Sequence, residues 1–394
     1  MSYKPLPPNF FTCPPLTTEE KERFKEIGYA AAHELAEKIE LRGGPIQWRL
    51  DSDEKEVKIY KGFDSLQPRG TAASSAFMAT MDVMGTMDEV VDLFRSQTTE
   101  QAKEYVRRFG NLMLDAVNLY SIVPFTAENP KEMIGISWRA FKLKGDKVVM
   151  KRDAVVIDTH TTINYKGKPA WIRCIKSVEI PCCPDMQELL GFVRMTHHIT
   201  GHMFTESDRP GYLHIDYILQ SDLKGTVGDY TSWIVDNSVK TRLRSIAFID
   251  RFLRENRLSK TPFLTPDKCV PTGSASRCFR CKYSFNPLSK KNNCLKCGQV
   301  CCRRCIQLWD VKNRGFDAQA LVCNMCALGT LEETKDPSLS DSKEEASTGS
   351  ENDSYVREQP VEANVAEGLD ESQLSLSKFE LIIDPKAWAS PSSP

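Results

Sequence analysis

The chain has 394 residues, of which 41% are apolar, 27% are charged and 14 are cysteines, and its formal net charge is −1. This length and composition allow two ordered domains and a long tail. The sequence contains no run of about eighteen apolar residues, which excludes a predicted membrane-spanning helix. The net charge hides an asymmetry, because residues 331–394 carry −10 and residues 1–330 carry +9.

Helix signals mark three regions of the first 260 residues. Residues 1–16 are rich in proline and are expected to form a flexible N-terminal arm. Thr17-Thr18-Glu19-Glu20 is a capping box that opens a helix ending near Gly43-Gly44-Pro45. Thr86-Met87-Asp88-Glu89 is a second capping box and opens a pair of short helices. An apolar stripe at helical spacing predicts one long helix over residues 230–258.

Strand patterns fill the space between these helices. Alternation over residues 46–50 and 57–60 predicts a hairpin, and residues 69–82 predict a third strand. Between residues 116 and 220, strand follows strand, separated by turns such as Lys166-Gly167-Lys168. Alternating apolar and polar residues over 213–220 predict an antiparallel sheet with one dry and one wet face.

Five short motifs give this region a family resemblance. They are Lys151-Arg152-Asp153-Ala154-Val155, Ser177-Val178-Glu179-Ile180-Pro181, Gly191-Phe192-Val193-Arg194, Gly211-Tyr212 and Ser221-Asp222-Leu223-Lys224-Gly225. With the order of the elements, they make residues 17–258 resemble a START domain, although Ala154 and Ile180 replace an aromatic residue and a histidine of the family pattern. The resemblance implies an α+β helix-grip fold, in which a curved antiparallel sheet surrounds a long C-terminal helix. It also implies a cavity for one apolar lipid, gated by a loop near that helix.

Candidate cavity residues follow from strand alternation. A sheet that grips a helix can close over packed side chains or over a cavity, and periodicity does not separate these alternatives. We select Asp153, Arg173 and Trp171 as residues of the cavity side. Our hypothesis is that Asp153 pairs with Arg173, because an isolated buried ion is costly. The alternative is that both lie on the wet face.

Four CxxC pairs lie within residues 278–326. A CxxC pair places two thiolates on one tight turn, so eight cysteines predict two tetrahedral Zn²⁺ sites. Disulfides are disfavoured by the lack of a secretory signal and by the scattering of the other six cysteines, and nothing indicates the redox partner of an iron–sulfur cluster. The predicted ligands are Cys278, Cys281, Cys294, Cys297, Cys302, Cys305, Cys323 and Cys326.

The segment Cys294-Leu295-Lys296-Cys297-Gly298-Gln299-Val300-Cys301-Cys302-Arg303-Arg304-Cys305 resembles the FYVE zinc finger. That resemblance implies a cross-brace, with Cys278, Cys281, Cys302 and Cys305 on one zinc and the other four cysteines on the second. It covers residues 277–328. The family's headgroup-binding run is replaced here by Lys290-Lys291-Asn292-Asn293, so recognition of phosphatidylinositol 3-phosphate is an open alternative.

A basic surface accompanies the eight cysteines. Residues 277–326 contain ten basic and two acidic residues, a balance of +8. Lys290, Lys291 and Arg303, with Leu288 as an apolar tip, are our candidates for contact with an anionic or phosphoinositide membrane. A solvated basic surface or a protein partner are the alternatives, and nucleic acid is not expected.

Sequence motifs of common enzymes are absent: there is no GxSxG, GxGxxG or P-loop, so no catalytic residue is assigned and we expect no enzyme. Residues 259–276 form a proline-containing linker, and residues 329–394 an acidic, serine-rich tail expected to be disordered.

Two functions are compatible with these features. The first is a cytoplasmic lipid-transfer or lipid-sensing protein, held peripherally on endosomal or other organelle membranes by its finger. The second is a non-enzymatic scaffold whose finger binds protein and whose first domain carries no lipid.

Overall fold

The computed structural model describes residues 3–68, 71, 74–109, 113–143, 150–224 and 232–329. These residues belong to one compact unit. Apart from Gly329, the acidic tail lies outside the described residues. Among the described helices, none has the length and apolar character needed to span a bilayer.

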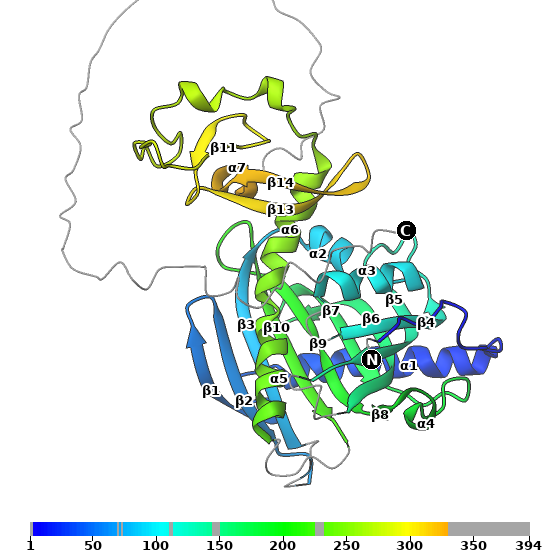
Figure 1. Ribbon diagram of the computed structural model, residues 1–394. Coiled ribbons are helices and arrows are strands. Elements are labelled where there is room, and N and C mark those ends of the chain that lie inside the picture. Colours follow the sequence, from blue (N-terminus) through cyan, green and yellow to red (C-terminus); the bar gives the residue numbers. More distant parts are fainter. Residues whose placement is uncertain are drawn as a thin grey trace, which may run out of the picture. The chain divides into compact units, whose positions relative to one another are not determined.

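A ten-stranded sheet dominates the first domain (Figure 1). Its strands follow the order β1-β2-β3-β10-β9-β7-β6-β5-β4, with antiparallel neighbours, and the short β8 pairs with β6 in parallel. Pairing of β3 with β10 joins the first and last parts of the domain. The strands are β1 (Ile46–Glu54), β2 (Val57–Asp64), β3 (Ser75–Met84), β4 (Met113–Val123), β5 (Met133–Phe141), β6 (Lys151–Tyr165), β7 (Lys168–Ser177), β8 (Phe192–Arg194), β9 (Thr196–Glu206) and β10 (Tyr212–Asp222).

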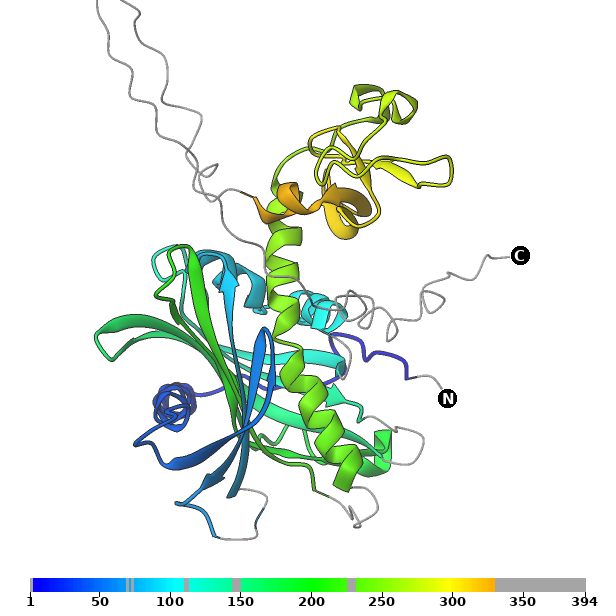
Figure 2. The same ribbon diagram turned by 90° about the vertical axis from the view of Figure 1, so that its left-hand side faces the viewer.

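Helices cover both faces of the sheet (Figure 2). The helix α1 packs on one face through Ala32 and Leu35, against Ile172 and Met203. The helices α5 and α6 pack on the concave face with α2, around residues such as Phe94. The predicted α+β helix-grip fold is therefore confirmed. The helices of the first domain are α1 (Thr18–Lys38), α2 (Met87–Phe94), α3 (Thr99–Phe109), α4 (Gln187–Leu190), α5 (Ser232–Arg244) and α6 (Ala247–Lys260).

Both predicted capping boxes are confirmed. In α1, the Thr17 side chain accepts a hydrogen bond from the Glu20 amide, and the Glu20 carboxylate accepts one from the Thr17 amide. Thr86 and Glu89 repeat this exchange at the start of α2. Because each exchange satisfies two otherwise unpaired amides, it fixes where the helix begins.

The single long helix predicted for residues 230–258 is wrong, since the chain forms α5 and α6 with a break between them. The amides of Ser245 and Ile246 donate to the carbonyls of Arg242 and Leu243, three residues earlier. Ser245 Oγ also donates to the Arg242 carbonyl. This tight turn interrupts the α-helical ladder without interrupting the apolar stripe, so periodicity alone did not reveal it.

The N-terminal arm is anchored to the sheet, a feature that the sequence analysis did not predict. Leu6 is buried, and its amide donates to Asp115 Oδ2 at 2.6 Å. Tyr3 Oη donates to the same carboxylate at 2.8 Å. The ring of Phe11 lies 5.7 Å from that of Trp138, centroid to centroid. The anchors come from β4 and β5, far away in sequence, so the arm itself carries no periodic signal.

The C-terminal part of the described chain is built from short elements around the cysteines. Two two-stranded sheets, β11 with β12 and β13 with β14, are antiparallel. Its elements are the 3₁₀ turns η3 (Pro266–Lys268) and η4 (Thr272–Ser274), the strands β11 (Lys291–Asn293), β12 (Val300–Cys302), β13 (Ile306–Asn313) and β14 (Phe316–Cys323), and the helix α7 (Asn324–Leu328).

Candidate functional site

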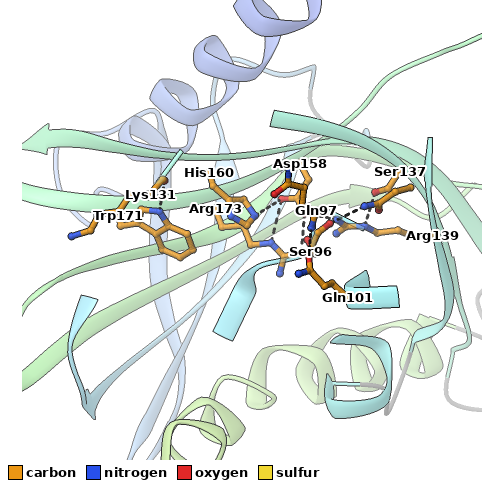
Figure 3. Close-up of polar contacts among 11 residues, drawn as sticks. Ser96, Gln97, Gln101, Lys131, Ser137, Arg139, Asp158, His160, Trp171 and Arg173 are labelled. Atoms are coloured by element: carbon orange, nitrogen blue, oxygen red, sulfur yellow. Dashed lines mark hydrogen bonds and ion pairs between the residues drawn. The ribbon is translucent and has the colours of Figure 1, made fainter. Parts of the chain in front are cut away.

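A cluster of charged side chains lies inside the first domain, on the concave face of the sheet (Figure 3). Arg139 comes from β5, Asp158 and His160 from β6, and Arg173 from β7, and all four are buried. His160 stands opposite Arg173 in the β6–β7 register, so both project to the same face. Arg139, Asp158 and His160 were not among the predicted site residues. The available signal was Asp158, an ionisable residue that interrupts the apolar part of a predicted strand.

Asp158 accepts from both arginines. Arg173 Nε and Nη2 donate to its two carboxylate oxygens at 3.2 and 2.9 Å, and Arg139 Nη2 also contacts Oδ2. His160 Nε2 lies 3.3 Å from Oδ1. Arg139 Nε donates to Ser137 Oγ at 3.1 Å. The carboxylate therefore bridges two cationic groups within a largely apolar interior.

The hypothesis that Asp153 pairs with Arg173 is wrong. Asp153 accepts instead from Arg194 Nε and Nη2, at 3.0 and 2.8 Å, and from Trp138 Nε1 at 2.8 Å. Its neighbours in alternation, such as Val155, belong to the apolar cluster on the opposite face from Arg173. Because Asp153 and Arg173 are both buried, the alternative that they lie on a wet face is also wrong.

The cluster carries an excess positive charge. Burial alone would raise the pKa of Asp158, but Arg173 and Arg139 outweigh it and hold that pKa well below its usual range. Burial lowers the pKa of His160, which favours the neutral ring. Two guanidinium groups therefore face one carboxylate. Arg173 Nη1 has no hydrogen-bond partner among the residues that the structure describes.

Aromatic rings fill the space around this cluster. Trp171, the third cavity candidate, is buried on the concave face, and its indole Nε1 donates to the Lys131 carbonyl at 2.9 Å. The guanidinium of Arg173 lies 5.1 Å from the ring centre of Phe94 and 4.5 Å from that of Tyr105. A hollow lined by residues including Ser96, Asn118, Arg139 and Asp158 has room for about one water molecule.

Two buried histidines near this cluster predict a destabilisation in acid. Burial, reinforced by nearby arginines, holds the pKa values of His197 and His202 well below the usual value. As the pH falls below about 6.5, the unfolded chain binds protons that the folded chain does not, so folding stability decreases. We expect a loss of about 1 kcal/mol per histidine at pH 5.5, measured by urea unfolding at pH 7.5 and 5.5.

His214 provides the control for this prediction because its pKa shifts the other way. A hydrogen bond to Asp216, aided by Asp82, raises the pKa of His214 to about 9 despite partial burial. The folding stability that protonated His214 provides is complete below about pH 6.5 and is lost as the pH rises through about 9. His214 therefore adds stability between pH 7.5 and 5.5, so H214N should make the acid loss steeper, whereas H197N should reduce it. An unchanged slope in H197N would contradict the assignment.

The eight cysteines form two four-thiol sites. Cys278, Cys281, Cys302 and Cys305 make one group, and Cys294, Cys297, Cys323 and Cys326 make the other, with the sulfur atoms of each group within 4.8 Å of one another. The interleaved grouping implied by the cross-brace is thus present. All-thiolate tetrahedra suit Zn²⁺, so this donor set fits the expected metal. We call residues 277–328 the double cysteine module.

Backbone groups and one arginine support these sulfur atoms. The amides of Cys302 and Cys323 donate to the sulfur atoms of Cys278 and Cys294, each at 3.3 Å. Arg280, inside the first CxxC turn, donates from Nε to Cys323 of the other site at 3.3 Å. The Arg280 cation, carried by the turn of one site, therefore offsets part of the negative charge that the other site has when its thiolates hold a metal.

The predicted membrane residues differ in their surroundings. Leu288 is 93% exposed, and Lys290 and Arg303 are also exposed. Lys291 is half-buried, and its Nζ donates to the Ala275 carbonyl at 2.8 Å. Since Lys291 pairs with Cys302, Lys290 and Arg303 flank the same end of the β11–β12 ribbon. Three of the four candidates are therefore available to a partner.

Asn293, at a position where the FYVE pattern has a histidine, serves the fold. Its Nδ2 donates to the carbonyls of Val270 and Gly298, at 2.7 and 3.1 Å. Gly298 adopts a positive φ of 71°, a conformation that side chains disfavour. The asparagine thus ties the second cysteine turn to the preceding segment instead of projecting toward a headgroup.

The observed fold and sites define the class of protein as a helix-grip α+β domain joined to a double four-cysteine module. No protein-family model matches the chain. Lateral signaling target protein 2 from Caenorhabditis elegans and its counterpart from Caenorhabditis briggsae are each 29% identical over 63 residues, or 16% of this chain. The match spans a tenth of the length of these curated relatives, 10% of each.

Solved structures similar to the chain include two human proteins. StAR-related lipid transfer protein 5 is 17% identical, with a TM-score of 0.46, and the match covers 59% of this chain and 98% of that one. Human STARD10 is 15% identical, with a TM-score of 0.36, and the match covers 61% of this chain and 83% of that one.

Proposed function

We propose that the first domain is a non-enzymatic START-like lipid-binding domain, whose interior holds one amphipathic lipid with an anionic headgroup. The observation that carries this proposal is the excess positive charge of the buried Arg139–Asp158–Arg173 cluster. A buried charge without a counterion is costly, and an anionic headgroup at Arg173 Nη1 would compensate it. The acyl chain would lie among the aromatic rings, each buried CH₂ contributing about 0.8 kcal/mol.

Lipid entry requires α5 and α6 to move away from the sheet, because side chains fill the concave interior. Phe252 of α6 contacts the ring of Phe109, with centroids 4.7 Å apart, and Arg242 Nε of α5 donates to Tyr217 Oη at 2.8 Å. The break at Ser245 divides these contacts between two helices. In this proposal, one helix can therefore move away from the sheet while the other keeps its contacts.

The double cysteine module, in this proposal, binds two Zn²⁺ and recruits the chain to an anionic organelle membrane, with endosomes as the expected site in the cytoplasm. Recruitment to such a membrane is supported by the net charge of +8 over residues 277–326 and by the exposed side chain of Leu288. Exposed basic residues contribute about 1 kcal/mol each near such a surface. The FYVE-like cysteine framework supports phosphatidylinositol 3-phosphate as the lipid, while Asn293 argues for a weaker headgroup site.

Native mass spectrometry of the full chain tests the proposal. After delipidation and incubation with equal amounts of phosphatidic acid and phosphatidylcholine, we expect one lipid per chain, predominantly phosphatidic acid. R173M should bind phosphatidic acid about 10-fold more weakly or worse, whereas K168M, altering an exposed pair with Asp208, should bind normally. Flotation with vesicles containing phosphatidylinositol 3-phosphate tests recruitment on the same sample.

The alternative is a scaffold whose first domain carries no lipid, and the packed aromatic interior favours it. Retention of no lipid by the correctly folded chain would establish this alternative against the carrier. Equal retention by the R173M variant and the unmodified chain would leave lipid binding intact but overturn the anionic headgroup site.

A further inference from the structure

Two cysteines outside the metal sites lie side by side. Cys13, on the N-terminal arm, and Cys182, in the loop before α4, are separated by 169 residues, yet their sulfur atoms are 2.7 Å apart. Their scattered positions in the sequence gave no reason to expect a pair. Both side chains are partly exposed, so a small oxidant in solution can reach them.

The backbone on both sides of this contact is held in place. Cys13 precedes Pro14, and the loop runs Pro181-Cys182-Cys183-Pro184, so proline restricts φ on each side. Tyr120 Oη donates to the Pro14 carbonyl at 2.9 Å and thereby fixes the arm.

On the loop side, Arg194 Nη2 donates to the Pro184 carbonyl at 2.7 Å. The same guanidinium is held by Asp153, which gives that buried carboxylate a role in positioning the loop. The two sulfur atoms are therefore placed by independent anchors, and forming a bond of about 2.05 Å needs a movement of under about 1 Å.

We propose that Cys13 and Cys182 are a redox-active thiol pair that oxidises to a disulfide and locks the N-terminal arm onto the sheet. With a small disulfide such as oxidised glutathione as oxidant, one cysteine thiolate attacks it, forming a mixed disulfide and releasing one glutathione. The second cysteine displaces the other glutathione. The protein loses two electrons and two protons, one S–S bond forms, one breaks, and two glutathione thiols result.

The arm is the element that the bond controls. In the reduced chain it depends on contacts such as those of Tyr3 and Leu6 with Asp115. A bond between Cys13 and Cys182 closes a loop that contains the strands β1 to β7 and restricts the arm's detachment. Burial and the neighbouring Cys182 raise the pKa of Cys13 to about 12, so that thiol stays protonated in neutral solution.

Peptide mapping of the zinc-loaded full chain tests the pair. After oxidised glutathione treatment, free thiols are alkylated and the chain is digested with trypsin without reduction. We expect a disulfide between the peptides 1–21 and 177–194, reversed by dithiothreitol. Half of the unmodified chain should form the disulfide at an oxidised glutathione concentration about 10-fold lower than that needed to glutathionylate half of Cys182 in C13S. The reason is that Cys13 is already positioned next to Cys182. Amide hydrogen exchange over residues 3–16 should slow on oxidation.

The variant C183S is the matched control, because Cys183 is adjacent but buried. It should keep the cross-link, and C182S should lose it. The proposal is overturned if Cys13 is still a free thiol, and is therefore alkylated, at oxidant concentrations that oxidise Cys182. It is also overturned if the product links Cys182 to Cys183 or joins two chains, and both products are distinguished in the same digest. Zinc release, followed with a chromogenic chelator, identifies samples in which the ligand cysteines were oxidised instead.

Discussion

Removal of the proposed Zn²⁺ ions should unfold the double cysteine module, because its small apolar core is built around the cysteines themselves. Cys278, Cys294 and Cys323 are members of that core. Structural zinc contributes about 10–16 kcal/mol per site in finger peptides. Titration with a chelator should release two Zn²⁺ per chain, together with loss of amide protection over residues 277–328. The variant C278S should bind one Zn²⁺ or fewer.

Cys269 offers the matched control for this experiment. It lies just before the module but outside both four-thiol groups. C269S should bind two Zn²⁺ and unfold like the unmodified chain. If C278S also kept two Zn²⁺, the ligand assignment would be wrong. If C269S lost one, a ninth thiol would have to be included in the sites.

The first domain should survive chelation, with a reduced melting temperature. The last turns of α6 contact the module: Leu258 is part of its apolar core, Ser259 Oγ accepts from the Lys312 amide at 2.9 Å, and Glu255 Oε1 accepts from the Asp310 amide at 3.4 Å. Loss of these contacts should lower the melting temperature of the first domain by roughly 5 °C. Simultaneous melting of both parts would mean that they form one cooperative unit.

The cysteine sites were predictable from sequence because their determinants are local. Each CxxC turn is complete within a few residues, and the expected grouping of Cys278 and Cys281 with Cys302 and Cys305 needed only a family resemblance. The contact between Cys13 and Cys182 has no such local signal, since it depends on how the arm crosses the finished sheet.

The charged cluster could be predicted only in part, for a related reason. Alternation along β6 places the side chains of Asp153 and Asp158 on opposite faces of the sheet. It does not predict which of the two faces is covered by α5 and α6. That choice depends on the order of ten strands and on the face that α1 occupies. Arg173 was therefore only a candidate for the cavity side, and the partner proposed for it, Asp153, lies on the other face of the sheet.

Replacing Asp158 with Asn should strongly destabilise the first domain. It leaves Arg139 and Arg173 facing each other without a carboxylate, and breaking a buried charge pair costs about 3–5 kcal/mol. R173M should cost less, because it leaves Asp158 and Arg139 as a one-to-one pair. Urea unfolding of both variants at pH 7 measures which of them is less stable. D208N, which removes an exposed ion pair with Lys168, should show no measurable change.

Acid titration separates the charge of Asp158 from its packing. The folded-state pKa of Asp158 lies below its unfolded value of about 3.9, so its stabilisation is complete above about pH 4 and is lost as the pH falls further. D158N has no such contribution, so its stability should approach that of the unmodified chain as the pH decreases toward 2. A constant difference at all pH values would mean that the loss comes from side-chain packing. If R173M were as destabilising as D158N, the excess positive charge would not be the controlling quantity, and the anionic headgroup would lose its physical basis.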